Sequence, residues 1–108
     1  MIARVNYFDG LTQEQKRVQE DNTTRRFKAA ITSQPGLVAL FYLERPTGDR
    51  VGISVWESQQ AMEEGGARAN ATPLLPGQRG EDIPSPTRTE VWAVRDHFLS
   101  GESVGSKA

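Results

Sequence analysis

The chain contains no cysteine among its 108 residues and a single histidine, His97. Without cysteine there are no disulfides, thiolate nucleophiles, iron–sulfur clusters or cysteine-ligated zinc, which is compatible with the cytoplasmic location that we predict. The net charge of −1 gives no basic field that would attract nucleic acid or a membrane surface. No run approaches the ~18 apolar residues of a membrane span, and no metal-ligand spacing, phosphate loop or Ser-His-Asp pattern is present. We therefore expect neither a metal site nor a nucleic-acid or membrane partner.

The length and an ordinary composition, 36% hydrophobic and 25% charged, predict one domain with a modest core. We expect this domain to span residues 1–98. Residues 99–108 are rich in serine and glycine and are predicted to form a flexible tail.

The segment from Pro35 to Glu57 carries the clearest structural pattern. Residues 37–45 are apolar, aromatic and β-branched, and residues 50–56 alternate between two faces. A turn cluster at residues 46–49 separates them, so the segment predicts a β-hairpin. Both alternating sets of the first strand are apolar, which is typical of a strand covered on both faces.

The flanking sequence supplies the other elements. Residues 1–8 predict a strand, and residues 87–96 predict another after a proline-rich loop at 72–86. A helix is expected from the capping-box pattern at Thr12 to Ser33, with a kink or break near residues 21–24, which are poor helix formers. Ser58 can cap a second helix that either stops at Gly65-Gly66 or continues to about Ala71.

This order of elements predicts an α+β fold with ferredoxin-like βαββαβ topology and a four-stranded antiparallel sheet. Right-handed crossovers place both helices on one face of the sheet and leave the other face bare. Because the hairpin is apolar on both faces, we expect a second copy to cover the bare face, giving a homodimer through the sheet faces.

Three short stretches also carry a family resemblance: Pro35-Gly36-Leu37, Val55-Trp56-Glu57-Ser58 and Ala61-Met62. In these, and over roughly Met1 to Val94, the chain resembles the antibiotic biosynthesis monooxygenase (ABM) domains of the dimeric α+β barrel superfamily. The resemblance implies that fold and dimerisation. It leaves the activity open, since the family includes cofactor-free monooxygenases, haem-degrading monooxygenases and members without a known reaction.

The resemblance also implies two catalytic candidates, Asn6 and Trp56. In the haem-degrading branch an asparagine in the first strand and a tryptophan at the end of the third line the pocket, and a histidine on the second helix binds iron. Residues 58–71 contain no histidine. The cofactor-free branch uses similar asparagine and tryptophan residues without any cofactor and therefore fits the chain better.

Each candidate residue has a structural alternative. Arg4 and Asn6 interrupt an apolar strand face, so they either lie on an edge or solvent-facing surface or line a pocket. Trp56 could be a core aromatic or could stack on a planar substrate. Arg4 could favour a phenolate or form a surface or dimer ion pair. The other predicted substrate-binding residues are Tyr42, Ser54 and Trp92. Tyr42 and Trp92 could equally be interface aromatics.

Our first functional hypothesis is a cofactor-independent monooxygenase. It would oxidise a small planar phenol or hydroquinone with O2, bound in a pocket between the barrel face of the sheet and a helix. The alternative is a non-catalytic dimeric module that binds a small aromatic ligand or serves in stress. A haem-degrading monooxygenase is the third hypothesis.

Overall fold

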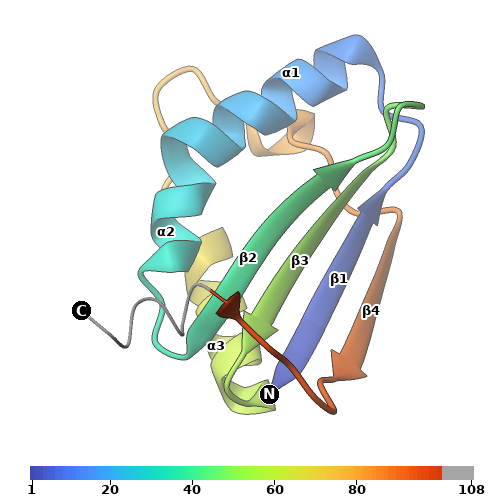
Figure 1. The fold of residues 1–108 in the computed structure, drawn as a ribbon. Helices are drawn as coiled ribbons and strands as arrows, with labels where there is room; N and C mark the ends of the chain where they lie inside the picture. Colours follow the sequence, from blue (N-terminus) through green and yellow to red (C-terminus); the bar gives the residue numbers. More distant parts are fainter. Residues whose placement is uncertain (101–108) are drawn as a thin grey trace.

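The computed structural model describes residues 1–100, which form one antiparallel sheet with helices on one side (Figure 1). The strands are β1 (Ile2–Phe8), β2 (Leu37–Glu44), β3 (Arg50–Trp56) and β4 (Arg88–Ala93), in the order β2-β3-β1-β4. Between β1 and β2 a continuous helical segment comprises α1 (Gln13–Asn22), the π-helix η1 (Thr23–Phe27) and α2 (Lys28–Thr32). Helix α3 (Gln59–Asn70) and the short 3-10 helix η2 (Gly80–Asp82) connect β3 to β4. The predicted ferredoxin-like fold is confirmed.

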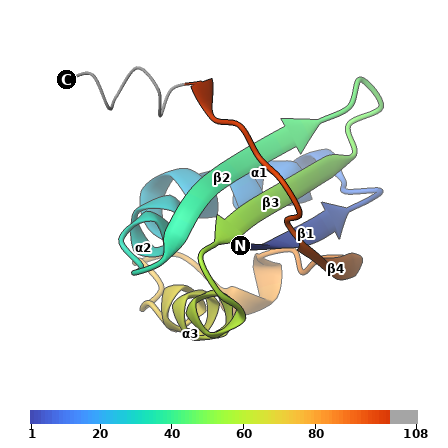
Figure 2. The ribbon, with the colours of Figure 1, turned by 60° about the horizontal axis from the view of Figure 1, so that its bottom comes forward.

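The strand register assigns each side chain to one of two faces. Arg4 pairs with Ser54 and Asn6 pairs with Gly52, so these residues share the face that contains Trp56, here called the inner face. Helices α1, α2 and α3 cover this inner face. None of these three covers the opposite, open face, which the chain after β4 crosses (Figure 2). Because β1 lies between β3 and β4, the interpretation of Arg4 and Asn6 as edge residues is wrong.

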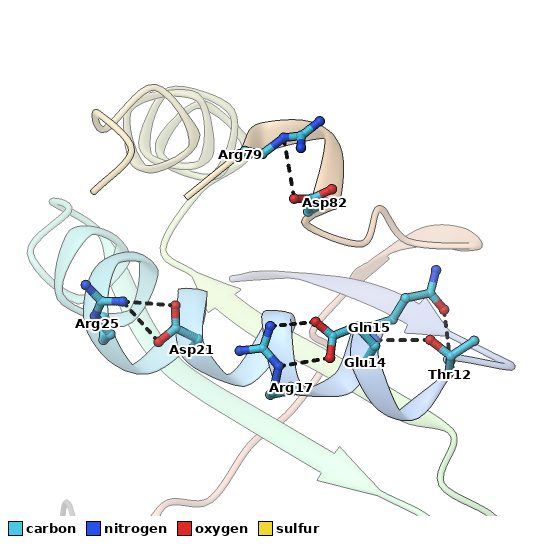
Figure 3. A network of polar contacts seen from close by, with 8 residues as sticks. All are labelled: Thr12, Glu14, Gln15, Arg17, Asp21, Arg25, Arg79 and Asp82. Carbon is cyan, nitrogen blue, oxygen red and sulfur yellow. Dashed lines mark hydrogen bonds and ion pairs between the residues drawn. The ribbon is translucent and has the colours of Figure 1, made fainter. Parts of the chain in front are cut away.

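The first helix begins as the sequence predicts. The Gln15 backbone N–H donates to Thr12 Oγ1 at 3.1 Å, and the Thr12 N–H donates to Gln15 Oε1 at 2.8 Å, which completes a capping box (Figure 3). The exposed side of α1 carries further polar pairs, such as Arg17 with Glu14. The helix is not broken near residues 21–24, where a kink or break was expected, but its α-helical pattern changes there to the π-helical turn η1, a local widening that is often found at functional sites.

The sequence left open whether the second helix stops at Gly65-Gly66 or continues to about Ala71. Helix α3 continues through both glycines to Asn70. Both glycines are buried for a steric reason. A Cβ atom at Gly65 would lie 2.5 Å from the Trp56 ring, and one at Gly66 would lie 2.9 Å from an Arg4 guanidinium nitrogen. The helix therefore accepts two poor helix formers so that it can lie close to these side chains.

The hydrophobic core lies where α2 and α3 pack against the sheet. Trp56 is 1% exposed and packs with Ile31, Met62 and Ala69, with Ile2, Leu37 and Leu40 around them. A hydrophobic cluster of this size fits the modest core expected from the length. No helix among residues 1–100 is long and apolar enough to cross a membrane.

The C-terminal part differs from the prediction in length. The strand expected at residues 87–96 is shorter, Arg88–Ala93, although the Val94 N–H still donates to the Met1 carbonyl at 3.0 Å. The loop predicted at residues 72–86 includes η2. Of the predicted tail 99–108, residues 101–108 lie outside the described residues.

Candidate functional site

A cavity of about 600 Å³ lies between the inner face of the sheet and the helical layer. Five of the six residues predicted for the site line it: Arg4, Asn6, Tyr42, Ser54 and Trp56. They meet here because β1, β2 and β3 are neighbours and their register places these five positions on the same face. The apolar part of the wall comes from both layers and includes Phe27, Ile31 and Leu40.

Trp92, the sixth predicted residue, does not line this cavity. It pairs with Ala3 and therefore lies on the open face, where it is 59% exposed. We expected the pocket on the barrel face of the sheet, through which dimerisation is expected. The cavity lies instead on the face that the helices cover.

At the α3 end of the cavity, several hydrogen-bond donors lack a protein acceptor. Trp56 is buried, and its Nε1–H has no hydrogen-bond partner within residues 1–100. Arg4 is half-buried, and its guanidinium forms no hydrogen bond or ion pair with any other described residue. Ser54, which is 7% exposed, lies directly opposite Arg4 on β3. Buried donors without partners are rare in folded proteins and suggest a place for a ligand or for water.

The orientation of Asn6 is set by a residue that the sequence analysis missed. The Thr89 hydroxyl on β4 donates to Asn6 Oδ1 at 2.8 Å. Because the carbonyl oxygen of the amide is engaged, this assignment leaves the Asn6 NH₂ group free to donate into the cavity. Only the register between β1 and β4 identifies Thr89, because nothing in its local sequence distinguishes it.

At the α1 end of the cavity, polar side chains are paired around Arg50. Its Nε donates to Glu44 at 2.7 Å and one terminal nitrogen donates to Glu20 at 2.7 Å. The other terminal nitrogen donates to Gln19 Oε1 at 3.1 Å. Hydrogen bonding to Arg50, followed by its charge, holds the pKa of Glu44 below its usual value. Sequence analysis did not find this network, since its members are distant along the chain.

A second arginine, Arg26, is buried behind the site. It lies in η1 and donates to the backbone carbonyls of Asn70, Thr72 and Pro73 and to Asn22 Oδ1. A cation at the carbonyl end of α3 also interacts favourably with the helix dipole. Arg26 therefore holds the helical layer together and uses four of its five N–H donors on protein acceptors.

Tyr42 contributes a hydroxyl to the cavity from the edge strand β2. Partial burial raises the pKa of Tyr42 above its ordinary value, so the hydroxyl stays protonated at neutral pH. It can therefore donate a hydrogen bond but is a poor general base. His97 follows β4, is exposed and does not line the cavity, and residues 1–100 contain no cluster of three histidine, cysteine or acidic residues suited to a metal.

The sheet order and the helices on one face define a ferredoxin-like α+β fold, and the half-open cavity between them has the size of a small molecule. No family model and no curated protein sequence matches the chain. Solved structures do match in fold.

One is a monooxygenase from the gene ActVA-Orf6 of Streptomyces coelicolor in complex with the ligand nanaomycin D, with a TM-score of 0.63 and 18% identity over 91% of this chain and 90% of that chain. Another is SnoaB, a cofactor-independent oxygenase from Streptomyces nogalater, with a TM-score of 0.61 and 19% identity over 90% of this chain and 95% of that chain. A third is MhuD with two manganese protoporphyrin IX molecules bound per active site, with a TM-score of 0.63 and 15% identity over 92% and 99% of the two chains. The fold expected from the resemblance to ABM domains is confirmed.

Proposed function

We propose that the chain is a cofactor-independent monooxygenase that oxidises a small planar phenol or hydroquinone with O2. The observation that carries this proposal is the cavity on the inner face, where Asn6 and Arg4 carry donors and Trp56 lines the wall together with apolar side chains. Its volume of about 600 Å³ suits a fused aromatic ring system. The likeness in fold to two oxygenases, one described as cofactor-independent, supports the same reaction class.

The first step is ionisation of the phenol. The two carboxylates in the cavity wall, Glu20 and Glu44, are both engaged by Arg50, and Tyr42 is protonated. The phenol proton therefore passes to water, and the unpaired charge of Arg4 stabilises the phenolate by lowering the pKa of the phenol.

The second step is oxidation of the phenolate. The electron-rich ring passes one electron to O2, and recombination of the two radicals gives a ring peroxide. The peroxide loses the ring hydrogen and breaks its O–O bond, so one oxygen atom stays as the quinone carbonyl and the other leaves as water. The NH₂ group of Asn6 is the donor available for the developing negative charge, and the Trp56 ring with the other apolar side chains of the wall limits access of water.

Oxygen consumption on phenols, hydroquinones and anthrones, without added metal or flavin, tests this proposal. We expect uptake by the native chain and a loss on the order of tenfold or more in Trp56→Phe and Asn6→Ala, because each removes a donor or reshapes the wall. Arg45→Gln, which changes an exposed residue away from the cavity, is the control. No uptake on any compound, together with ligand-induced stabilisation, would support the non-catalytic binding module instead.

A haem-degrading function has less support from the site. MhuD shares the fold and binds manganese protoporphyrin IX. In this chain α3 carries no histidine, and the only histidine, His97, lies away from the cavity. A haem titration is expected to give no shift of the Soret band, whereas a saturable shift would revive this hypothesis.

We also propose that the open face pairs with a second copy of the chain. Phe41 and Leu43 of β2 are 46% and 51% exposed on this face, and Trp92 of β4 is 59% exposed. Large exposed apolar patches mark interaction surfaces, and two identical faces can pair symmetrically. Light scattering should give about twice the 11.9 kDa of one chain, and a monomer mass would contradict this proposal. The cytoplasmic location stays a prediction.

A further inference from the structure

We infer that the aromatic ligand of this cavity carries a carboxylate and that Arg4 is the residue that selects it. This inference rests on the proposed use of the inner-face cavity by an aromatic substrate, but it concerns recognition and is independent of whether O2 reacts. The evidence is the contrast between free donors and occupied acceptors along the cavity wall.

Two donors of the cavity wall, those of Arg4 and Asn6 on β1, have no protein acceptor among the described residues. The NH₂ group of Asn6 is free because Thr89 occupies its oxygen. The Nε1–H of Trp56 also has no partner among the described residues, but this atom is fully buried beneath the cavity surface. Arg4 adds an unpaired positive charge to the same surface. By contrast, the acceptors of the wall, Glu20 and Glu44, are engaged by Arg50. A ligand group that only accepts hydrogen bonds and carries negative charge would pair with the free donors of Arg4 and Asn6.

The strand register brings these donors into one surface. Arg4 lies opposite Ser54, and on the same face Ile2 lies opposite Trp56 while Asn6 lies opposite Gly52. Directly opposed side chains on a sheet start about 5 Å apart, so Arg4 and Ser54 adjoin the same small group, and Asn6 is the next residue along β1 on that face.

Helix α3 leaves room for the guanidinium of Arg4. A Cβ atom at Gly66 would come within 2.9 Å of Arg4 Nη1, so the absence of a side chain lets the guanidinium lie against the helix backbone. This position keeps Arg4 at the cavity wall without the help of a protein carboxylate. The other two arginines of the site differ, since Arg26 and Arg50 use their donors on protein acceptors.

A carboxylate fits better than a neutral hydroxyl or a phosphate. The fork of a guanidinium matches two carboxylate oxygens, which a single phenol oxygen does not provide. The charged residues of the wall are Arg4, Glu20, Glu44 and Arg50. Because Arg50 pairs with both carboxylates, Arg4 is left with one positive charge, which matches a single negative charge on the ligand. The carboxylates of Glu20 and Glu44 repel a second anionic group at the far end, which leaves that part of the cavity to the neutral ring system.

The test compares 3-hydroxy-2-naphthoate, its methyl ester and 2-naphthol by calorimetric titration under nitrogen at pH 6.5, where only the carboxylate is ionised. We expect the acid to bind about tenfold or more tightly than the ester, as a charge-assisted pair contributes. Arg4→Gln should remove this preference, and Arg45→Gln should keep it. Equal binding of acid and ester, or a preference that survives Arg4→Gln, would overturn the inference.

Two further measurements keep the test decisive. Gly66→Ala retains the charge but displaces the Arg4 guanidinium, so it should weaken binding of the acid and leave the ester unchanged; this variant replaces Arg4→Gln if the latter does not fold. Binding of 2-naphthol above the pKa of its hydroxyl as tight as that of the acid at pH 6.5 would overturn the carboxylate assignment in favour of a phenolate. Selective binding of the acid without oxygen uptake would refute the proposed monooxygenase and leave this inference intact.

Discussion

The two ends of the cavity are closed in different ways. At the α3 end, Trp56 is packed into the core and its neighbours Gly65 and Gly66 let the helix approach the sheet. At the α1 end, Val18 is the only apolar side chain of the helix, and Arg50 links α1 to the sheet through Glu20, Gln19 and the Lys16 carbonyl. Close packing therefore fixes one end, and polar contacts that water can replace fix the other.

This difference has a consequence for function. Arg4, which we assign to the ligand, lies against α3 at the packed end, where side chains have little freedom, as a preorganised site requires. The α1 end is held by ion pairs of Arg50 with exposed carboxylates, and such pairs individually contribute little to stability. We therefore expect the α1 end to open more easily and to admit the ligand.

The largest effect should come from Trp56→Ala. The side chain is 1% exposed and central to the core, so its removal should destabilise the fold by about 3–5 kcal/mol. Urea unfolding followed by far-ultraviolet circular dichroism measures this loss. A change below about 1 kcal/mol would show that the α3 end is not packed as described.

The two glycines of α3 offer a matched pair. Gly65→Ala should cost about 1–3 kcal/mol, since the new Cβ would meet the rigid Trp56 ring at 2.5 Å. Gly66→Ala should change stability by no more than about 1 kcal/mol, because Arg4 can move aside and alanine favours the helix. The same unfolding measurement compares them, and equal costs would contradict the assignment of Gly65 to packing and Gly66 to the site.

Arg50→Gln should loosen the α1 end selectively. It removes two ion pairs whose carboxylates are largely exposed, so the loss of stability should be about 1 kcal/mol. Hydrogen exchange should become faster in α1 and stay unchanged in α3. Uniform acceleration across both helices would mean that the two ends are not independent.

Acidification should give the smallest effect. The folded pKa of Glu44 lies below its usual value of 4.5, because Arg50 hydrogen-bonds and attracts the carboxylate. The stabilisation is therefore present at neutral pH and is lost as the pH falls below 4.5 through the lowered pKa. Melting curves from pH 6 to pH 3 should fall less steeply for Glu44→Gln than for the native chain, and parallel curves would argue against the Arg50–Glu44 contact.

Much of the fold follows from local sequence patterns. The alternation in residues 50–56, the turn at residues 46–49 and the capping box at Thr12 are local signals, and the structure confirms them. The weak helix formers after residue 20 also predicted the interruption that appears as η1. Alternation also groups Arg4 with Asn6 on one face of the first strand and Ser54 with Trp56 on one face of the third, because residues two apart in a strand point the same way.

The rest depended on tertiary structure. Which face each strand turns to the helices depends on register between strands, so Trp92 was assigned to a cavity although it lies on the open face. Thr89 and Arg50 acquire their partners only when distant segments meet, as do the contacts that make Gly65 and Gly66 necessary. The sequence by itself determined the elements, their order and two faces for each strand. Only the tertiary structure decided which donors keep a partner and which remain free for a ligand, because hydrogen bonding between distant residues leaves no local pattern.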